Sequence, residues 1–122
     1  MNGNNLLVDT NVFIHFFEGN RKALKIMRGN NIFFTTITEI ELLGFAGLSV
    51  GEKSIMRDFL SDCNRVELTE EIREQTILLR ESLRIKIPDA IVAASALHLH
   101  FPLVSADTDF RKISDLTLIT LD

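Results

Sequence analysis

Apolar residues follow two alternating patterns along the chain, short continuous runs and longer stretches at helical spacing. The short runs have the length and composition of strands, at residues 6–8, 32–35, 65–68, 103–105 and 118–120. The fragment at 65–68 is the most polar and is typical of an exposed or edge strand. The longer stretches predict helices at residues 12–17, 21–27, 38–45, 52–60, 70–83 and 88–97, with a short helical turn at 109–113. Short apolar strands alternating with helices predict an α/β fold with a mainly parallel sheet covered on both faces.

The length of 122 residues and the hydrophobic content of 46% suit one sizeable core, so we expect a single domain over residues 1–122. No stretch of about 18 apolar residues and no signal-peptide pattern occurs, which predicts a cytoplasmic protein without a membrane span. The net charge of −4 argues against a protein that coats nucleic acid with a basic surface. An acidic site that holds divalent cations can still accept a phosphodiester through them.

Four acidic residues stand where an apolar run stops or a helix begins, namely Asp9, Glu41, Asp89 and Asp107. Each has an ordinary explanation when taken alone. Either Asp9 or Thr10 could cap a helix, Glu41 could form a capping box with Thr38, Asp89 is a favourable charge at a helix start, and Asp107 could form an Asx turn. These separate explanations do not explain why all four acids fall at positions that lead to the same edge of the sheet. Because the carboxyl ends of parallel strands lie at one edge of a sheet, all four carboxylates can converge there.

The segments around these acids resemble, in order, the four acidic motifs of PIN-domain ribonucleases, and most closely those of VapC-type toxins from toxin–antitoxin pairs. They are LVDTN at 7–11, TEIELLG at 38–44, PDAIVAA at 88–94 and LVSADTDF at 103–110. The resemblance therefore spans nearly the whole chain. It implies a three-layer α/β/α PIN-like domain with a five-stranded, mainly parallel sheet. It also implies a Mg²⁺- or Mn²⁺-dependent endoribonuclease that serves as the toxin of such a pair.

Carried over from the family, Asp9, Glu41, Asp89 and Asp107 are the expected catalytic acids, and Asp109 is a further acidic position. Carboxylate oxygens suit the chemistry, because Mg²⁺ prefers oxygen ligands and keeps several waters. Asp9 and Asp107 are expected to bind the metal directly, and Asp89 directly or through water. Glu41 is expected to be a ligand or the base that orients water.

Glu39 competes with Glu41 for the place in the second motif. Residues two apart on a helix point about 200° from each other, so only one of them can face the site. We favour Glu41, because the preceding Thr38 and the following Leu42 fit the family pattern better.

Residues near the acidic motifs are candidates for RNA contact. Arg80, Arg84 and Lys86 lead up to Asp89 in the sequence, where phosphate contacts would position the scissile bond. A solvated helix face is the alternative explanation for these basic residues. Asn11 and Ser105 are expected to hydrogen-bond either the metal ligands or a phosphate.

The resemblance also implies partners. A small antitoxin is expected to cover the acidic site, and a homodimer is expected, with contact through the apolar surface of the helices spanning residues 38–60. The alternative is a PIN-like module without nuclease activity that binds RNA or a protein partner. A receiver domain or a haloacid-dehalogenase phosphatase is disfavoured, because Asp9-Thr10-Asn11 provides no second acid after the first strand.

Overall fold

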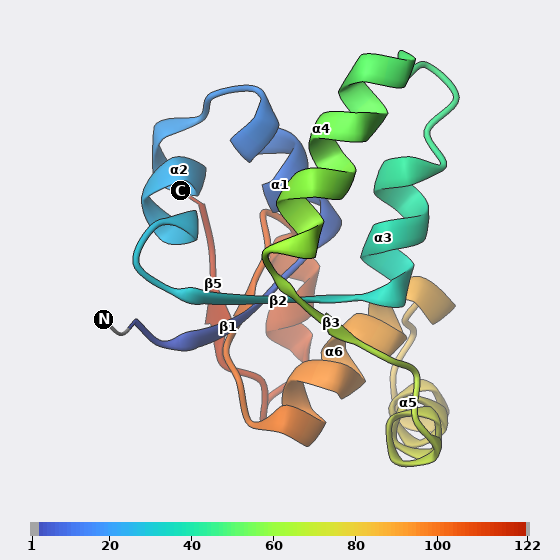
Figure 1. Ribbon diagram of the computed structural model, residues 1–122. Coiled ribbons are helices and arrows are strands. Elements are labelled where there is room, and N and C mark those ends of the chain that lie inside the picture. Colours follow the sequence, from blue (N-terminus) through green and yellow to red (C-terminus); the bar gives the residue numbers. More distant parts are fainter. Residues whose placement is uncertain (1–2, 122) are drawn as a thin grey trace.

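Five strands form one sheet in the order β3-β2-β1-β4-β5 in the computed structural model, which describes residues 3–121 (Figure 1). The strands are β1 (Asn5–Val8), β2 (Asn31–Thr35), β3 (Asn64–Val66), β4 (Leu103–Val104) and β5 (Leu118–Ile119). Every neighbouring pair is parallel. The predicted five-stranded parallel sheet is therefore confirmed, and β3 lies at an edge as its composition indicated.

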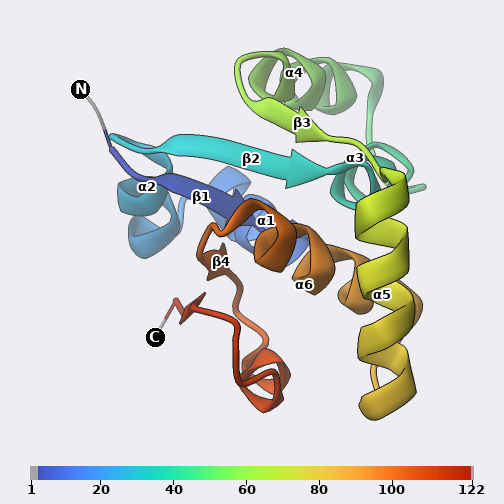
Figure 2. The same ribbon diagram turned by 90° about the horizontal axis from the view of Figure 1, so that it is seen from below.

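Six α-helices and one 3₁₀ helix connect these strands. They are α1 (Thr10–Phe17), α2 (Arg21–Met27), α3 (Thr36–Leu43), α4 (Val50–Ser61), α5 (Glu70–Ser82), α6 (Ile87–Leu99) and the 3₁₀ helix η1 (Thr108–Lys112). Helices α1 to α4 lie on one side of the sheet, and α6 lies on the other with α5 packed against it (Figures 1 and 2). This arrangement confirms the expected three layers. No helix within residues 3–121 is long and apolar enough to span a membrane.

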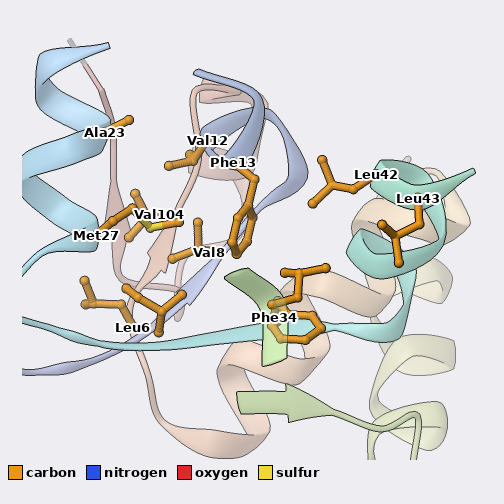
Figure 3. Packing of buried hydrophobic residues seen from close by; sticks show 12 residues of the cluster. Leu6, Val8, Val12, Phe13, Ala23, Met27, Phe34, Leu42, Leu43 and Val104 are labelled. Atoms are coloured by element: carbon orange, nitrogen blue, oxygen red, sulfur yellow. The ribbon is translucent and has the colours of Figure 1, made fainter. Parts of the chain in front are cut away.

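The two faces of the sheet carry separate hydrophobic clusters. Leu6 and Val8 of β1 pack with Phe13 of α1 on one face, where Phe13 also meets Phe34 edge to face at 6.2 Å between ring centroids (Figure 3). Leu7 points to the opposite face and packs against α6. This alternation follows from the two-residue period of a strand, and burial on both faces explains why the strand sequences are continuously apolar.

Helix α6 is the buried helix that the sequence predicts. Its residues 90–96 are all buried, and Ala90, Ala93, Ala94 and Ala96 have no exposed surface. Val92, Ala93 and Ala96 pack on Leu7 of β1 and Leu103 of β4. Side chains that stop at Cβ allow a helix to approach a sheet closely, so α6 lies tightly under the two central strands.

The start of α3 differs from the sequence interpretation. Thr35 is the N-cap and its side chain accepts from the backbone N–H of Thr38, so the helix begins two residues before the expected position. Thr38 is fully buried within the first turn, and the expected capping box with Glu41 is absent. Glu41 is therefore not occupied in capping. The capping box of this structure lies instead at the start of α4, between Ser49 and Glu52.

Candidate active site

The order in which the chain adds strands to the sheet reverses at β1. Its neighbours are β2 on one side and β4 on the other, and a crevice beyond the carboxyl ends of the strands is the usual ligand site at such a switch point. Asp9 directly follows β1, and Asp107 lies three residues after the end of β4. Asp89 belongs to the first turn of α6 and Glu41 to α3.

All four carboxylates line one hollow of about 350 Å³, which we call the acidic hollow. The remaining lining residues are Thr10, Asn11 and Ile14, so no basic side chain lines it among the residues described. The structure therefore brings together the four acids that the sequence suggested.

Asp9 is the most buried of the four, with 8% of its surface exposed. The backbone N–H of Thr10 donates to Oδ1 at 2.9 Å, and the Ser105 hydroxyl donates to Oδ2 at 2.8 Å. The capping explanation for Asp9 is therefore correct as far as it goes. Burial nevertheless raises the pKa of Asp9 to about 6, assisted by the charges of Asp89 and Glu41 and opposed by the two hydrogen bonds.

Asn11 and Ser105 form a bracket around Asp9. The Asn11 amide nitrogen lies 3.5 Å from Asp9 Oδ2 and 3.4 Å from Ser105 Oγ, and its amide oxygen accepts from the Ala106 N–H at 3.1 Å. The Asp107 N–H donates to Ser105 Oγ at 3.0 Å. Of the two interactions expected for Ser105, the structure contains the one with a carboxylate, since this side chain has no exposed surface. The bracket fixes Asp9 relative to the segment that carries Asp107.

Glu41 is held from α1. The Thr10 hydroxyl donates to Glu41 Oε1 at 2.6 Å and lies 3.0 Å from the hydroxyl of Thr38. Glu39 lines no part of the hollow, and its Oε2 is 3.4 Å from Nη1 of Arg65. Of the two competing glutamates, Glu41 is the one that faces the other acids. Thr10 and Thr38 were not identified as site residues from the sequence.

Asp89 and Asp107 are the other two acids that line the hollow. Burial raises the pKa of Asp89, the charges of Asp107 and Glu41 add to this effect, and Lys86 and Lys112 oppose it. Asp107 Oδ1 accepts from the backbone N–H of Asp109 at 2.9 Å, so the Asx turn expected here is present.

Asp109 lines a second hollow of about 240 Å³ rather than the acidic hollow. We call this second hollow the side pocket. Asp89 and Asp107 line both, and Arg84, Lys86 and Lys112 line the side pocket alone. Two of the predicted basic residues therefore lie beside the acids.

Arg80 lies elsewhere. It lines a different, largely apolar pocket, and its Nε donates to the carbonyl of Ile85 at 3.1 Å. The structure thus places Arg80 as a support for the loop before α6, apart from the acidic hollow. The third basic residue of the side pocket is Lys112, which was not identified from the sequence. Its Nζ donates to the carbonyl of Arg84.

The acidic hollow suits a divalent cation by its donors and its charge. Asp9 is buried beside like charges that raise its pKa, so a cation there would relieve an existing repulsion. Within residues 3–121, no three Asp, Glu, His or Cys side chains form a ready-made metal cage. Mg²⁺ is usually held by one or two carboxylates and keeps several waters, which is a donor set that the acids of the hollow contain.

Comparison with protein families gives a match to the PIN domain over residues 6–116. The chain belongs to the PIN-domain family. A comparison with curated proteins gave no match.

Several solved structures share this PIN fold. A toxin–antitoxin complex from Klebsiella pneumoniae matches with a TM-score of 0.84 and 28% identity, covering 96% of this chain and 98% of that one. DNA-bound VapBC from Salmonella typhimurium matches with a TM-score of 0.85 and 17% identity over 97% of this chain and 98% of that one. VapBC2 from Rickettsia felis, bound to a promoter DNA fragment, matches with a TM-score of 0.80 and 20% identity over 97% and 99%. The PIN domain described here thus resembles proteins crystallised in toxin–antitoxin complexes.

Proposed function

We propose that this PIN domain is a Mg²⁺- or Mn²⁺-dependent endoribonuclease that hydrolyses RNA phosphodiester bonds, and that it is the toxin of a toxin–antitoxin pair. The observation that carries the proposal is the acidic hollow, where four carboxylates from four elements meet without a basic partner in its lining. The structural likeness to a toxin–antitoxin complex supports the assignment as a toxin.

The residues of the hollow have distinct proposed roles. Asp9 and Asp107 would hold the metal directly, and Asp89 would hold it directly or through water. A divalent cation bound there supplies Lewis-acid activation of the phosphodiester and of water. Glu41 orients the attacking water or adds a further ligand, and the Thr10 hydroxyl keeps one of its oxygens in place. Asp109 lines the side pocket together with Asp89 and Asp107, and its carboxylate is proposed as an additional metal ligand.

Two glutamates on the same helix give a matched test of the nuclease proposal. The purified protein is incubated with a synthetic single-stranded RNA in Mg²⁺, in Mn²⁺ or in EDTA, and the cut ends are mapped. We expect cleavage with either metal and none in EDTA. Glu41→Gln should abolish cleavage and Glu39→Gln should keep it, because only Glu41 faces the hollow. Cleavage that persists in EDTA, or equal activity of both variants, would overturn the assignment.

The alternative is a PIN-like module that binds RNA or a partner without cutting. It predicts RNA binding that is undiminished by Glu41→Gln, with intact RNA recovered at every metal concentration. The bracket of hydrogen bonds that fixes Asp9 favours the nuclease, because catalysis requires ligands held in a defined geometry.

An antitoxin is proposed to lie in a groove beside the acidic hollow. The groove, of about 330 Å³, is mainly apolar, has Glu18 and Glu52 among its lining, and shares Ile14 and Glu41 with the hollow. An amphipathic segment seated there would bring an Arg or Lys to the carboxylates, which a guanidinium can bind bidentately in place of the metal. Expression of the chain alone should arrest growth, and co-expression of the neighbouring small gene should restore it. Phe45→Asp, in the groove lining, should prevent that rescue.

A homodimer is proposed as well. Ile40, Val50 and Ile55 are exposed apolar residues in the region 38–60, and a second exposed apolar set on α5, α6 and the segment before α5 includes Leu78 and Ile87. Sedimentation should give about twice the chain mass of 13.8 kDa. Ile55→Glu should dissociate the dimer if the expected surface is used, and Leu78→Glu if the second set is used.

A further inference from the structure

The acidic hollow has two unlike flanks. The side pocket on one flank contains Arg84, Lys86 and Lys112, and shares Asp89 and Asp107 with the hollow. The groove on the other flank is mainly apolar, and its charged lining residues are all glutamates. A polyanion leaving the hollow therefore meets positive charge on one side and negative charge on the other.

The basic flank is braced. Lys112 at the end of η1 donates from Nζ to the carbonyl of Arg84, and Arg80 donates to the carbonyl of Ile85. The short segment between α5 and α6 is thereby tied at two successive carbonyls. Arg84 and Lys86 both belong to this segment, with Ile85 between them, so their backbone positions are held close to Asp89.

The simplest alternative is that these cations only neutralise the neighbouring acids. Three basic and three acidic residues line the side pocket, which would suit that purpose. Among residues 3–121, however, the ion pairs are those of His15 with Glu18 and of Arg65 with Glu39 and Glu67. None of the three basic side chains comes within 4 Å of a carboxylate, so each retains donors for an anion.

We propose that Arg84, Lys86 and Lys112 form a phosphate-binding subsite for the nucleotide adjacent to the scissile bond, so that the RNA strand leaves the acidic hollow on this side only. The inference rests on the proposed ribonuclease function. Phosphate contacts position a nucleic acid without reading its sequence, so the subsite sets the register of the cut and the length of RNA engaged.

The first test measures binding of a fluorescent single-stranded RNA in EDTA over a range of salt concentrations. Each phosphate contact that is lost should reduce the salt dependence of log K by about 0.7. The triple variant Arg84→Ala/Lys86→Ala/Lys112→Ala should therefore bind more weakly and lose up to about 2 from the slope. The control Arg21→Ala/Lys25→Ala/Arg28→Ala also removes three positive charges, but from the region of α2. Equal loss in both variants would show a general charge effect and overturn the subsite.

The second test locates the contact. RNAs carrying one uncharged methylphosphonate are compared, with the substitution either one position before or one position after the mapped cut. In wild-type protein one substitution should raise KM at least fivefold, and the other should leave it within twofold. The triple variant should lose this difference, and Lys112→Gln, which keeps a donor for the Arg84 carbonyl, should lose part of it. Equal sensitivity on both sides would overturn the one-sided path.

The outcomes separate the two proposals. A wild-type protein that cuts RNA, with a triple variant unchanged in KM and salt slope, would overturn the subsite and leave the nuclease intact. A wild-type protein that binds RNA through these residues but cuts none would overturn the nuclease and leave the subsite. Melting temperatures of both triple variants serve as the folding check.

Discussion

Asp9 caps α1 and Glu52 belongs to the capping box of α4, and these two hydrogen-bonded carboxylates behave in opposite ways. At α4, Glu52 exchanges hydrogen bonds with Ser49 in the open, and these bonds lower the pKa of Glu52. At α1, Asp9 also accepts backbone and side-chain hydrogen bonds, yet its pKa rises to about 6. Capping accounts fully for Glu52. It does not account for Asp9, because burial of this carboxylate near other acids destabilises its charged form, and a helix cap does not require such burial.

The largest expected difference between the two carboxylates is in catalysis. Asp9→Asn keeps the shape of the cap but removes a charge from the acidic hollow, so cleavage of RNA should fall by at least about 100-fold, equivalent to about 2.7 kcal/mol. Glu52→Gln should leave the rate within about twofold, since Glu52 lies outside the acidic hollow. Single-turnover rates in Mg²⁺ measure both. An Asp9→Asn protein that cuts at the wild-type rate would refute the assignment of the site.

Stability should move in the opposite direction from activity. The pKa of Asp9 is raised in the folded protein from 3.8 to about 6, so the folded state binds the proton more tightly. The resulting stabilisation is complete below pH 4 and is lost as the pH rises towards 6. At pH 7.5, without metal, the free energy of unfolding of Asp9→Asn should therefore exceed that of the wild type by about 2 kcal/mol in urea denaturation. This difference in stability should shrink below pH 5. A pH-independent difference would mean that the pKa of Asp9 is not raised.

Metal should remove part of the same cost. Mg²⁺ at ten times its Kd should stabilise the wild-type protein by about 1.4 kcal/mol, because it binds the folded state and screens the facing carboxylates. Asp9→Asn should show a smaller Mg²⁺ response, and Glu52→Gln an unchanged one. Thermal melts over millimolar MgCl₂ or MnCl₂ provide the measurement. Melting temperatures that ignore both metals would count against binding at these acids.

The smallest effect is expected at the exposed cap. Ser49→Ala removes the side-chain acceptor for the Glu52 N–H and should destabilise the protein by about 1 kcal/mol. Because the pKa of Glu52 is lowered, its contribution is present above the unfolded pKa of 4.5 and is lost as the pH falls below it. Acid titration of the stability of Glu52→Gln against wild type should therefore show the opposite slope to Asp9→Asn. Slopes of the same sign would remove the distinction between the two carboxylates.

The sequence reveals the parts of the site that depend on strand ends. Asp9 directly follows one predicted strand and Asp107 follows another after one intervening alanine, and the carboxyl ends of parallel strands meet at one edge of the sheet. Helical geometry indicated that only one of Glu39 and Glu41 can face the site, and the family pattern favoured Glu41, which lines the acidic hollow while Glu39 lies near Arg65.

What the sequence does not reveal depends on contacts between distant segments. Lys112 comes 23 residues after Asp89, and nothing in its surroundings shows that η1 folds back to reach the Arg84 carbonyl. Thr10 reads as a helix cap, and its bond to Glu41 appears only when α1 and α3 are placed side by side. The error at Thr38 had a local cause, because Thr35 also carries a hydroxyl that can cap a helix, and α3 begins at Thr36 behind it. Strand order was open for the same reason, since local periodicity does not choose neighbours.

The alanines of α6 have a consequence beyond stability. Asp89 is attached to the first turn of a helix whose buried residues Ala93 and Ala96 rest on Leu7 and Leu103, the strands that lead to Asp9 and Asp107. The packing of these apolar side chains between α6 and the sheet thus sets the distance from Asp89 to Asp9 and Asp107. A larger side chain in this layer would move Asp89 away from the other two acids. A larger side chain at Ala93 or Ala96 would therefore change the spacing of the acids that we propose as metal ligands, although the substitution itself lies deep in the core.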